Sequence, residues 1–461
     1  MADERWQNLS PGDLSVTLPE VVATPVEPAL AASAEVAASW ARTPLAERIE
    51  RLRGAQRALV EAKDELARGI SIETGKPITE AQGEVGAVIA KIDLTIADAE
   101  QHLADRTHLG GPHPALIRQH ARGPAVVIGP FNFPLHLGHG ANVAHLLAGN
   151  PVIYKPSPLA ANVAARYAEI VAPHFPAGVF QLVQGGGAAG EALCLDPRVR
   201  AVCFTGSVPV GRTLAQKLAG DFAKDVALEL GGSNALLVCA DADLDKAAQA
   251  AAEGACLTAG QRCNATSRVI VERAVAAAFE RKFLAALAVF EPGDPLSPAT
   301  KLGPVISAAA VARYAKLCAE RRGAWLLPGR AEPVVAGKRG HFIRPAVLQR
   351  EDDGRADAEC FVPIISLFIA DDLDHAVRLQ SAPPFGLTAS IFTQSEATFR
   401  ALGAHLEVGN LYANLPTTFS PSTLPFGGWR ESGNGRPGGR GFIRFTTREQ
   451  AVQWSGFPAS S

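Results

Sequence analysis

The sequence predicts an α/β protein built around a doubly wound parallel sheet. Its 461 residues are 47% hydrophobic and 20% charged, which is ordinary for a globular chain with room for two or three domains. Residues 29–105 have the composition and apolar spacing of helices, and from about residue 124 short apolar runs alternate with helix-length segments. Strands that alternate with helices are typical of parallel sheets covered on both faces.

Charge and cysteine content narrow the functional classes. Forty-four basic and 46 acidic residues leave a formal net charge of -2, so neither nucleic acid nor an anionic membrane surface is expected as a partner. The seven cysteines are irregularly spaced without a C-x-x-C pair, which argues against a disulfide framework and a zinc site. Residues 1–6 lack a basic segment followed by an apolar one, and the apolar run Phe283–Phe290 is far shorter than the roughly 20 residues of a membrane span. We therefore expect a cytoplasmic protein with a small-molecule partner.

The N-terminal stretch is predicted to be helical. Segment 45–52, with its recurring apolar spacing, is representative of residues 29–105, which show no strand-like alternation. Gly75 and Pro77 interrupt this pattern and predict that one helix ends and another begins there. The charged residues of this stretch are expected to be solvated.

Four apolar runs then predict consecutive parallel strands, at 126–128, 152–154, 179–183 and 201–204. Parallel sheets bind ligands where loops leave the carboxyl ends of the strands. Distinctive loops follow the strands at 129–134, 155–158, 184–187 and 204–211.

Loop 204–211 has two interpretations. Gly206 and Gly211 flank a turn between a strand and a helix-like segment, so backbone N–H groups and a helix N-terminus would face a phosphate. The loop lacks the G-x-G-x-x-G pattern, and two glycines five residues apart also occur in ordinary strand-to-helix turns.

A second series of strands is predicted at 226–230, 235–238 and 268–271. Glu229 lies inside the first apolar run, immediately before Gly231 and Gly232. It is either a solvent-facing strand residue or a general base whose apolar surroundings raise its pKa towards neutrality.

The remainder of the chain continues the α/β pattern. Residues 273–330 are predicted to be helical and then loop-rich, and strands are predicted at 364–368 and within 385–393. Residues 425–441 are dense in glycine, and 442–446 are predicted to be extended. This C-terminal tail is expected to add to a sheet, either in its own chain or in another subunit.

Cys263 is the candidate nucleophile. It follows Gly260, Gln261 and Arg262, which offer a close backbone approach and a neighbouring cation that would lower the pKa of the thiol. Without its context a cysteine of this kind is more often a small buried hydrophobic residue.

Seven ordered motifs supply that context. They are Asn132 in G-P-F-N-F-P, Lys155 in Y-K-P-S, F-T-G-S-x-x-x-G at 204–211, Glu229 in L-E-L-G-G, Cys263 in G-Q-R-C, Glu359-x-Phe361, and P-F-G-G at 425–428. Together they closely resemble the aldehyde dehydrogenase superfamily over nearly the whole chain. The resemblance implies a nucleotide-binding domain at 1–102 and 122–231 and a catalytic domain at 232–428. It also implies a small β arm at 103–121 and 429–461 that joins subunits into homodimers or homotetramers.

The resemblance also implies residue roles. Cys263 would attack an aldehyde, the Asn132 amide and the Cys263 backbone N–H would hold the oxyanion, and Glu229 would activate water against the thioester. The expected cofactor is NAD, with NADP as the alternative. Its riboses would contact Lys155 and Glu359, next to Phe361, and its pyrophosphate would contact Gly206, Ser207 and Gly211.

Further segments resemble a subfamily that oxidises N-succinyl-L-glutamate 5-semialdehyde in arginine catabolism. They are 91–96, 147–150, 258–263, 416–418 and 432–437. Arg262 and Arg436 are then candidate ligands of substrate carboxylates, and His136 is a candidate substrate contact. A surface or structural role is the alternative for both arginines.

Several positions depart from the family pattern. Pro158 replaces a frequent glutamate that pairs with the lysine at the ribose, which leaves the choice between NAD and NADP open, and Val362 replaces a glycine. Residues 135–140 differ from the subfamily, so another semialdehyde or a hydrophobic aldehyde is an alternative substrate.

Two other classes of function and a metal site are disfavoured. An acyl transfer to coenzyme A is disfavoured because Glu229 is present, and an inactive structural relative is disfavoured because Cys263, Asn132 and Glu229 occur together. His136, His139 and His145 have no Cys, Asp or Glu among them, so packing or substrate contact is preferred to metal binding.

Overall fold

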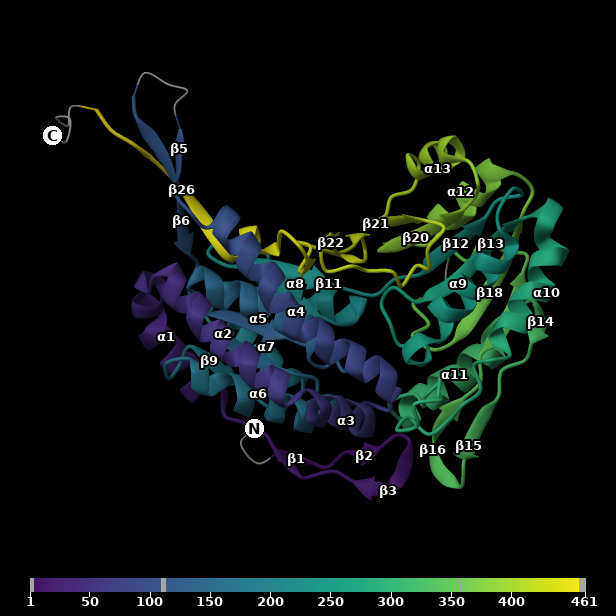
Figure 1. Ribbon diagram of the computed structural model, residues 1–461, viewed down its shortest axis with the longest axis horizontal. Coiled ribbons are helices and arrows are strands. Elements are labelled where there is room, and N and C mark those ends of the chain that lie inside the picture. The colour runs from purple at the N-terminus through teal and green to yellow at the C-terminus, as the bar shows by residue number, and fades with distance from the viewer. Residues whose placement is uncertain (1–3, 109–112, 356–357, 456–461) are drawn as a thin grey trace.

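Two large sheets, each flanked by helices, make up the body of the molecule (Figure 1). The computed structural model describes residues 4–108, 113–355 and 358–455. Within these residues no helix combines the length and the apolar character needed to cross a membrane.

The helical N-terminal stretch is confirmed. It contains α1 (Val26–Arg42), α2 (Leu45–Glu61), α3 (Lys63–Thr74) and α4 (Ile78–His102), with the predicted interruption between α3 and α4. The prediction that the charged residues are solvated is wrong for part of this stretch. Glu73, Lys76 and Glu84 are at most 3% exposed, because helices far apart in sequence cover them.

The first sheet has the strand order β24-β11-β10-β7-β8-β9. All neighbouring pairs are parallel except β24 against β11. The predicted strands are present as β7 (Ala125–Ile128), β8 (Val152–Lys155), β9 (Phe180–Leu182), β10 (Ala201–Thr205) and β11 (Asp225–Glu229), and β24 is Gly433–Asn434. The connecting helices are α5 (His136–Ala148), α6 (Ala161–Val171), α7 (Gly187–Leu195) and α8 (Val208–Leu218).

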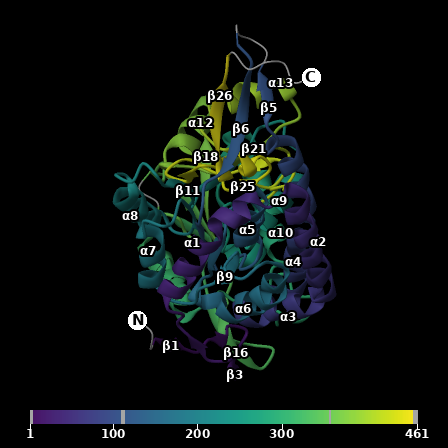
Figure 2. The same ribbon diagram turned by 90° about the vertical axis from the view of Figure 1, so that its left-hand side faces the viewer.

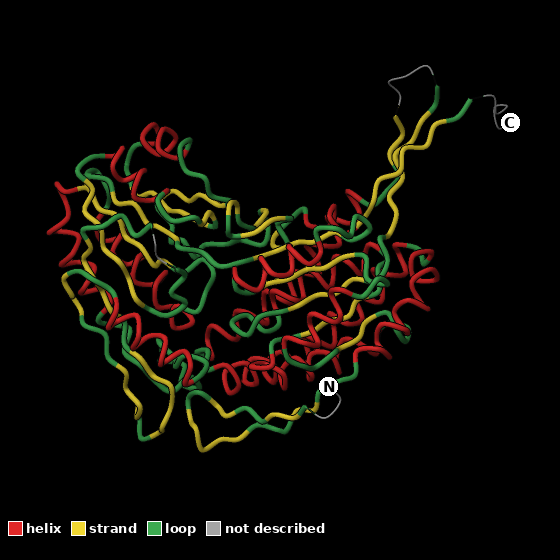
Figure 3. Tube along the Cα trace, turned by 180° about the vertical axis from the view of Figure 1, so that it is seen from behind, coloured by secondary structure: helices red, strands yellow, loops and turns green. Residues whose placement is uncertain are grey.

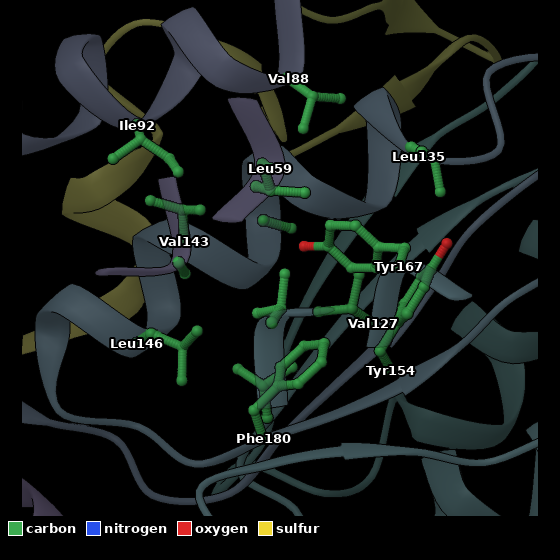
Figure 4. Close-up of a cluster of buried hydrophobic side chains, with 14 of the residues drawn as sticks. Leu59, Val88, Ile92, Val127, Leu135, Val143, Leu146, Tyr154, Tyr167 and Phe180 are labelled. Atoms are coloured by element: carbon green, nitrogen blue, oxygen red, sulfur yellow. The ribbon is translucent and has the colours of Figure 1, made fainter. Parts of the chain in front are cut away.

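Alternate strand residues point to opposite faces of this sheet, and each face has its own core. Val127, Tyr154 and Phe180 pack with residues of α2, α4, α5 and α6, as Figure 4 shows around Tyr167 and Leu59. Val126 and Ile153 pack on the other face with residues of α1, α7 and α8. Because helices cover both faces, the doubly wound parallel sheet predicted from the sequence is confirmed.

The second sheet has the order β14-β17-β18-β13-β12-β20-β21 and is parallel except for β14 against β17. Its strands are β12 (Asn234–Val238), β13 (Thr266–Glu272), β14 (Ala324–Leu327), β17 (Ala346–Arg350), β18 (Ile364–Ala370), β20 (Thr388–Phe392) and β21 (Asn410–Ala413). One face packs on α9 (Leu244–Cys256), α10 (Ala276–Leu287) and α11 (Ala308–Glu320), and the other on α12 (Leu373–Ser381) and α13 (Glu396–Gly403).

Short strand pairs and single helical turns complete the chain (Figure 3). The pairs are β1 (Arg5–Trp6) with β4 (Val21–Val22), β2 (Leu9–Ser10) with β3 (Asp13–Thr17), β15 (Ala331–Val335) with β16 (Lys338–Ile343), β19 (Phe385–Gly386) with β23 (Trp429–Arg430), and β22 (Pro425–Phe426) with β25 (Gly438–Gly439). The single turns are η1 (Pro158–Ala160), η2 (Ala172–His174), η3 (Leu257–Gly260) and η4 (Arg273–Val275).

The C-terminal tail differs from its prediction. Residues Phe442–Thr446 form a 3-10 turn, η5, so the prediction of an extended segment there is wrong. Phe442 and Ile443 are buried, and the Phe442 and Phe445 rings stack at 5.2 Å, which only a tight turn allows at this spacing. The extended segment begins one residue later as β26 (Thr447–Gln453).

β26 adds to a sheet of its own chain. It pairs with β6 (Ala115–Ala121), which also pairs with β5 (Arg106–His108), and the three strands project from the body (Figures 1 and 2). These strands come from the ranges predicted for the arm, of which 109–112 and 456–461 lie outside the described residues. β23 and β24 also come from the predicted arm but pair with strands of the body. The domain boundaries stay a prediction.

Candidate active site

Cys263 lies between two cavities. The first, which we call the sheet-edge cavity, has a volume of about 380 Å³ and lies at the carboxyl ends of β7, β8, β10 and β11. The second, which we call the α4 cavity, has a volume of about 350 Å³ and is lined by residues of α4, the start of α5 and the loop 420–422. Both cavities are lined by Cys263, so this residue borders each of them.

The backbone before Cys263 is conformationally strained. Thr258, Ala259 and Gly260 have φ values of 53°, 53° and 70°, which L side chains rarely adopt. A Cβ at Gly260 would lie 2.7 Å from the Val362 carbonyl carbon, so only glycine fits there. The close approach predicted from Gly260 is therefore present, and it places the nucleophile loop against residues 362–363.

Arg262 favours ionisation of the Cys263 thiol, as expected, but it does not decide the pKa of that thiol. Burial, with further contributions from Glu229 and Glu359, raises the pKa of the thiol well above its usual range. The opposing effect of Arg262 is outweighed, and its guanidinium is 2.7 Å from the Glu80 carboxylate, which compensates its charge. Ionisation of the thiol therefore needs help from another group.

Asn132 reaches the nucleophile loop from the loop that follows β7. It is 4% exposed, and its Nδ2 donates to the Gln261 carbonyl oxygen at 2.8 Å. Since the amide carries a second N–H, one donor remains to face the sheet-edge cavity, which Asn132 lines.

Glu229 ends β11 and lines the sheet-edge cavity. It is 2% exposed, so the solvent-facing interpretation is wrong. Neither carboxyl oxygen has a hydrogen-bond partner among the described residues, and burial raises the pKa of the carboxyl to about 8 despite the opposing charge of Arg436. A buried carboxyl that is free of partners and titrates near neutrality has the properties of a general base.

In the loop between β10 and α8, Gly206 and Ser207 line the sheet-edge cavity, whereas Gly211 does not. Both glycines are required by packing inside the protein. A Cβ at Gly206 would lie 2.5 Å from the Phe204 ring, and one at Gly211 would lie 2.5 Å from the Leu230 side chain. Ser207 precedes α8 and makes no side-chain capping bond to it. The N-terminus of α8 therefore faces the sheet-edge cavity without an internal cap, a geometry suited to a phosphate.

Two ionisable side chains line the same cavity on either side of this loop. Lys155 donates to the Pro156 carbonyl oxygen at 2.9 Å, and burial lowers its pKa to about 8. Glu359 accepts from the Gly232 N–H at 3.3 Å, and burial raises its pKa to about 7. The cavity therefore contains both a hydrogen-bond donor and an acceptor.

Phe361 is also part of this cavity, with Val362 behind it. Its φ is 54°, and its ring meets the Phe131 ring edge-on at 5.9 Å. Val362 is 4% exposed, so the side chain that departs from the family pattern is in the core rather than in the cavity.

The three candidate substrate residues are not brought together. Arg262 and His136 line the α4 cavity. Arg436 does not, and its guanidinium donates to the Gly409 carbonyl oxygen at 2.9 Å. Burial lowers the pKa of His136 to about 4, and its Nδ1 has no hydrogen-bond partner in the described part of the chain. His136 is thus a neutral imidazole with a ring nitrogen left unpaired.

Two carboxylates of the α4 cavity were missed by sequence reasoning. Glu80 and Glu84 line it from one face of α4. Their spacing of four residues was the available signal, because such residues lie on the same side of a helix. Their burial depends on segments more than 50 residues away, so the sequence favoured a solvated face.

The other two histidines are core residues. His139 Nδ1 is 2.7 Å from the Tyr167 hydroxyl, and His145 Nε2 is 3.4 Å from Cys203 Sγ. Across the described ranges no three His, Cys, Asp or Glu residues are grouped to hold a metal ion.

Comparison with known proteins places this site in a family. The model of the aldehyde dehydrogenase family matches residues 4–452. The chain belongs to the aldehyde dehydrogenase family. Family membership and the α/β fold predicted from the motifs are confirmed.

Individual aldehyde dehydrogenases are similar over most of the chain. The N-succinylglutamate 5-semialdehyde dehydrogenase 1 of Caulobacter vibrioides is 36% identical over 407 residues, which is 87% of this chain and 85% of that protein. The structure of an NAD-dependent aldehyde dehydrogenase from Sinorhizobium meliloti has a TM-score of 0.92 at 30% identity, covering 99% of this chain and 93% of that one. A 1-pyrroline-5-carboxylate dehydrogenase from Thermus with bound NAD has a TM-score of 0.91 at 27% identity, covering 98% and 90% of the two chains.

Proposed function

We propose that this protein oxidises an aldehyde to a carboxylate with a nicotinamide cofactor, through a covalent intermediate on Cys263. The observation that carries the proposal is the position of Cys263 between the two cavities, with Asn132 and Glu229 lining the sheet-edge cavity beside it. A thiol in that position is open to a cofactor on one side and an aldehyde on the other.

The residues of the sheet-edge cavity fit a dinucleotide. Gly206 and Ser207 line the cavity at the uncapped start of α8, where the pyrophosphate would bind, and Lys155 and Glu359 would hold the two riboses. NAD is the first choice of cofactor, as in the solved structures from Sinorhizobium meliloti and Thermus, and NADP is the alternative. When bound, the nicotinamide accepts the hydride that leaves the aldehyde carbon.

The protein groups supply the remaining chemistry. The Cys263 thiolate attacks the aldehyde carbon to give a thiohemiacetal, whose oxyanion accepts hydrogen bonds from the Asn132 amide and the Cys263 backbone N–H. A donor of this kind contributes about 3 kcal/mol to transition-state stabilisation in comparable sites. After oxidation to the thioester, Glu229 takes a proton from the attacking water, and the carboxylate product leaves with the thiol restored.

The proposed substrate is N-succinyl-L-glutamate 5-semialdehyde, which would place the enzyme in arginine catabolism. Support comes from the Caulobacter vibrioides relative at 36% identity. The side chains support this substrate less directly than expected, because Arg436 lies outside the α4 cavity and the charge of Arg262 is compensated by Glu80. His136, which lines the α4 cavity, is the remaining candidate for a polar substrate contact.

The test of the chemistry is the variant Cys263→Ala. It is expected to abolish aldehyde-dependent cofactor reduction while cofactor binding and thermal unfolding stay near wild type, because the thiol forms the intermediate and packs little. Mass spectrometry of the wild type mixed with aldehyde and cofactor should find the acyl group on the peptide containing Cys263. Oxidation that survives in the variant, or an adduct on Cys256, would reject the assignment.

The test of the substrate is a comparison of kcat/KM values. The kcat/KM for succinylglutamate semialdehyde is expected to be higher than the values for glutamate semialdehyde, succinate semialdehyde, a long aliphatic aldehyde and an aromatic aldehyde. A preference for either of the last two would remove the proposed substrate and leave the dehydrogenase chemistry standing.

A further inference from the structure

The first turn of α4 contacts the loop that carries the nucleophile. Glu80 accepts hydrogen bonds from the Thr258 N–H at 3.1 Å, the Thr258 hydroxyl at 2.8 Å and the Arg262 guanidinium at 2.7 Å. Arg262 Nε in turn donates to the Thr258 hydroxyl oxygen at 3.0 Å. One carboxylate therefore holds both ends of the segment that leads to Cys263.

This segment needs an external constraint because its conformation is unfavourable. Thr258 and Ala259 occupy the left-handed region at φ 53°, and each such residue costs on the order of 1 to 3 kcal/mol unless its surroundings compensate. Hydrogen bonds to a charged, largely buried acceptor are strong enough to offset this conformational cost. The side chain of Glu80 is 12% exposed and that of Arg262 is 14% exposed, so solvent competes little with these bonds.

Glu84, one helical turn further on, holds the other catalytic loop. Its carboxylate accepts from the Leu135 N–H at 3.0 Å and the His136 N–H at 3.2 Å, at the start of α5 and directly after the loop of Asn132. Its buried partner is Lys76. Glu80 and Glu84 thus contact the nucleophile loop and the Asn132 loop from neighbouring turns of a single helix.

The Phe133 ring lies between the two sets of contacts. Lys76 Nζ is 3.8 Å from the ring centroid, and the Arg262 guanidinium carbon is 4.9 Å from it. These cation–π contacts join the residue after Asn132 to the residue before Cys263. The relative position of the amide donor and the thiol therefore depends on the first two turns of α4.

We propose that Glu80 is a positioning residue, which holds the strained segment 258–262 so that the Cys263 thiol is presented to the aldehyde and to Asn132. The proposal rests on the proposed function, because it concerns the same thiol. Glu80 takes no part in bond making. It acts through Thr258 and Arg262, and it explains why Arg262 carries no free charge for a substrate carboxylate.

The test uses the full-length enzyme with Glu80→Gln, which keeps the size of the side chain and removes its charge. Displacement of a reacting group by about 1 Å can lower a rate by about 100-fold, so kcat is expected to fall about 10- to 100-fold. The KM for the cofactor is expected to stay within about threefold of wild type, because Glu80 does not line the sheet-edge cavity. Hydrogen–deuterium exchange of the peptide covering 256–264 is expected to accelerate.

Glu73→Gln is the matched control. Glu73 is a more deeply buried carboxylate that lines neither cavity, and it accepts from the Asn162 and Val163 N–H groups at the start of α6 and from the Asn8 amide. The Glu73→Gln variant is expected to have a lower melting temperature, with the hydrogen–deuterium exchange of 256–264 and the kcat of the folded fraction unchanged. An equal loss of kcat in both variants would show a general effect of removing a buried carboxylate and would overturn the proposal.

A second pair of variants covers the case in which Glu80→Gln does not fold because Arg262 loses its partner. Thr258→Ala keeps the Glu80–Arg262 ion pair and loses the hydroxyl, whereas Thr258→Ser keeps every hydrogen bond. The alanine variant is expected to lose kcat about 5- to 30-fold and the serine variant to stay near wild type. Equal activity of the two would overturn the proposal.

The exchange measurement separates this proposal from the proposed function. The exchange measurement needs neither aldehyde nor cofactor. A wild type that oxidises no aldehyde would therefore defeat the proposed function, but the exchange rate of 256–264 would still show whether Glu80 constrains this segment. Exchange at wild-type rates in Glu80→Gln would overturn the proposal, whatever the wild-type activity.

Discussion

Two buried carboxyls, Glu229 and Glu359, share the sheet-edge cavity with the Cys263 thiol, and all three are easier to protonate than in water. Burial is the largest cause in each case, because it disfavours the charged form of each group. A thiol in such a site stays protonated until a cation enters or a base accepts its proton. The oxidised nicotinamide is cationic, so cofactor binding is expected to precede the attack of Cys263 on the aldehyde.

The ionisation of Glu229 predicts the pH dependence of turnover. A base must be deprotonated to act, and the pKa of Glu229 is about 8, so steady-state turnover should rise with pH through about 8. Glu229→Gln should retain a single burst of reduced cofactor and lose turnover by at least about 100-fold, with the thioester accumulating on Cys263. Stopped-flow absorbance with quench mass spectrometry measures both quantities. Unchanged turnover in the variant would show that a different group is the base.

The same carboxyl predicts how stability changes with pH. The pKa of Glu229 rises from its ordinary 4.5 to about 8 on folding, so between these values the folded chain keeps a proton that the unfolded chain has lost. Wild-type stability should therefore fall from pH 4.5 to pH 8 relative to Glu229→Gln, which does not titrate. A tenfold change in an ionisation constant is worth about 1.4 kcal/mol, so the variant should be more stable by a few kcal/mol at pH 9.

Urea unfolding of both proteins at pH 5 and pH 9 checks this. The difference in the free energy of unfolding between Glu229→Gln and the wild type should be small at pH 5 and large at pH 9. A difference that shrinks towards alkaline pH would mean that Glu229 is stabilised in its ionised form.

At the residue scale the sequence predicted which candidate side chains lie together better than it predicted their burial and pKa values. The motifs located Cys263, Asn132 and Glu229, and the fold places these residues around one cavity. The pKa of Cys263 could not be predicted, because burial is the largest cause of its rise and depends on segments that are far apart in the sequence. The burial of Glu80 and Glu84 escaped prediction for the same reason, since a helix sequence does not say which segment will cover it.

At the scale of elements, the N-terminal segment packs against Pro158, which lines the sheet-edge cavity. Trp6 Nε1 and Asn8 Nδ2 donate to the Pro158 carbonyl oxygen at 3.1 Å and 2.8 Å. A Cβ at Gly186 would lie 3.2 Å from Glu4 Oε1, and the charge of Glu4 favours the protonated form of Lys155. A carboxylate therefore approaches Lys155 from the N-terminal segment, on the side where Pro158 offers none.

This arrangement predicts cofactor selectivity. Glu4 should repel the 2′-phosphate of NADP, so Glu4→Gln should raise the NADP to NAD ratio of kcat/KM about two- to fivefold, the range expected for an exposed charge. Pro158→Glu should lower the ratio, because it adds a carboxylate beside Lys155. Initial rates with both cofactors at fixed ionic strength measure the ratio. A ratio that neither substitution changes would show that the preference is set elsewhere.

Elements were predictable wherever apolar periodicity was strong. The parallel strands of the first sheet lie within a few residues of their predicted bounds, and the helical N-terminal stretch shows the predicted break between α3 and α4. The breaks between α1 and α2 and between α2 and α3, and the strand β24, were not predicted. Residues 442–446 were not predictable, because the sequence Phe-Ile-Arg-Phe-Thr has strand-forming composition. Its turn is selected by tertiary packing, in which Phe442 and Phe445 stack beside His145.

For the whole molecule, the three-stranded sheet of β5, β6 and β26 has few contacts with the body (Figure 2). Most residues of β26 are exposed, although the strand pairs with β6 along its full length of seven residues. A long edge strand with exposed backbone groups is open to pairing with another chain. We therefore expect this sheet to join subunits into a homodimer or homotetramer.

Truncation after Thr446 tests that expectation, because it removes β26 and leaves η5 with its buried Phe442 and Ile443 in place. The two large sheets draw no strand from the deleted residues, so the truncated chain should keep its far-ultraviolet circular dichroism and lose subunits. Light scattering after size exclusion should report a smaller assembly than wild type at equal concentration. Phe222→Ser, at a side chain that is 98% exposed, is the control for removing apolar surface outside the arm. If the truncated chain keeps the wild-type mass, the subunit contact lies elsewhere, and the projecting sheet has another role.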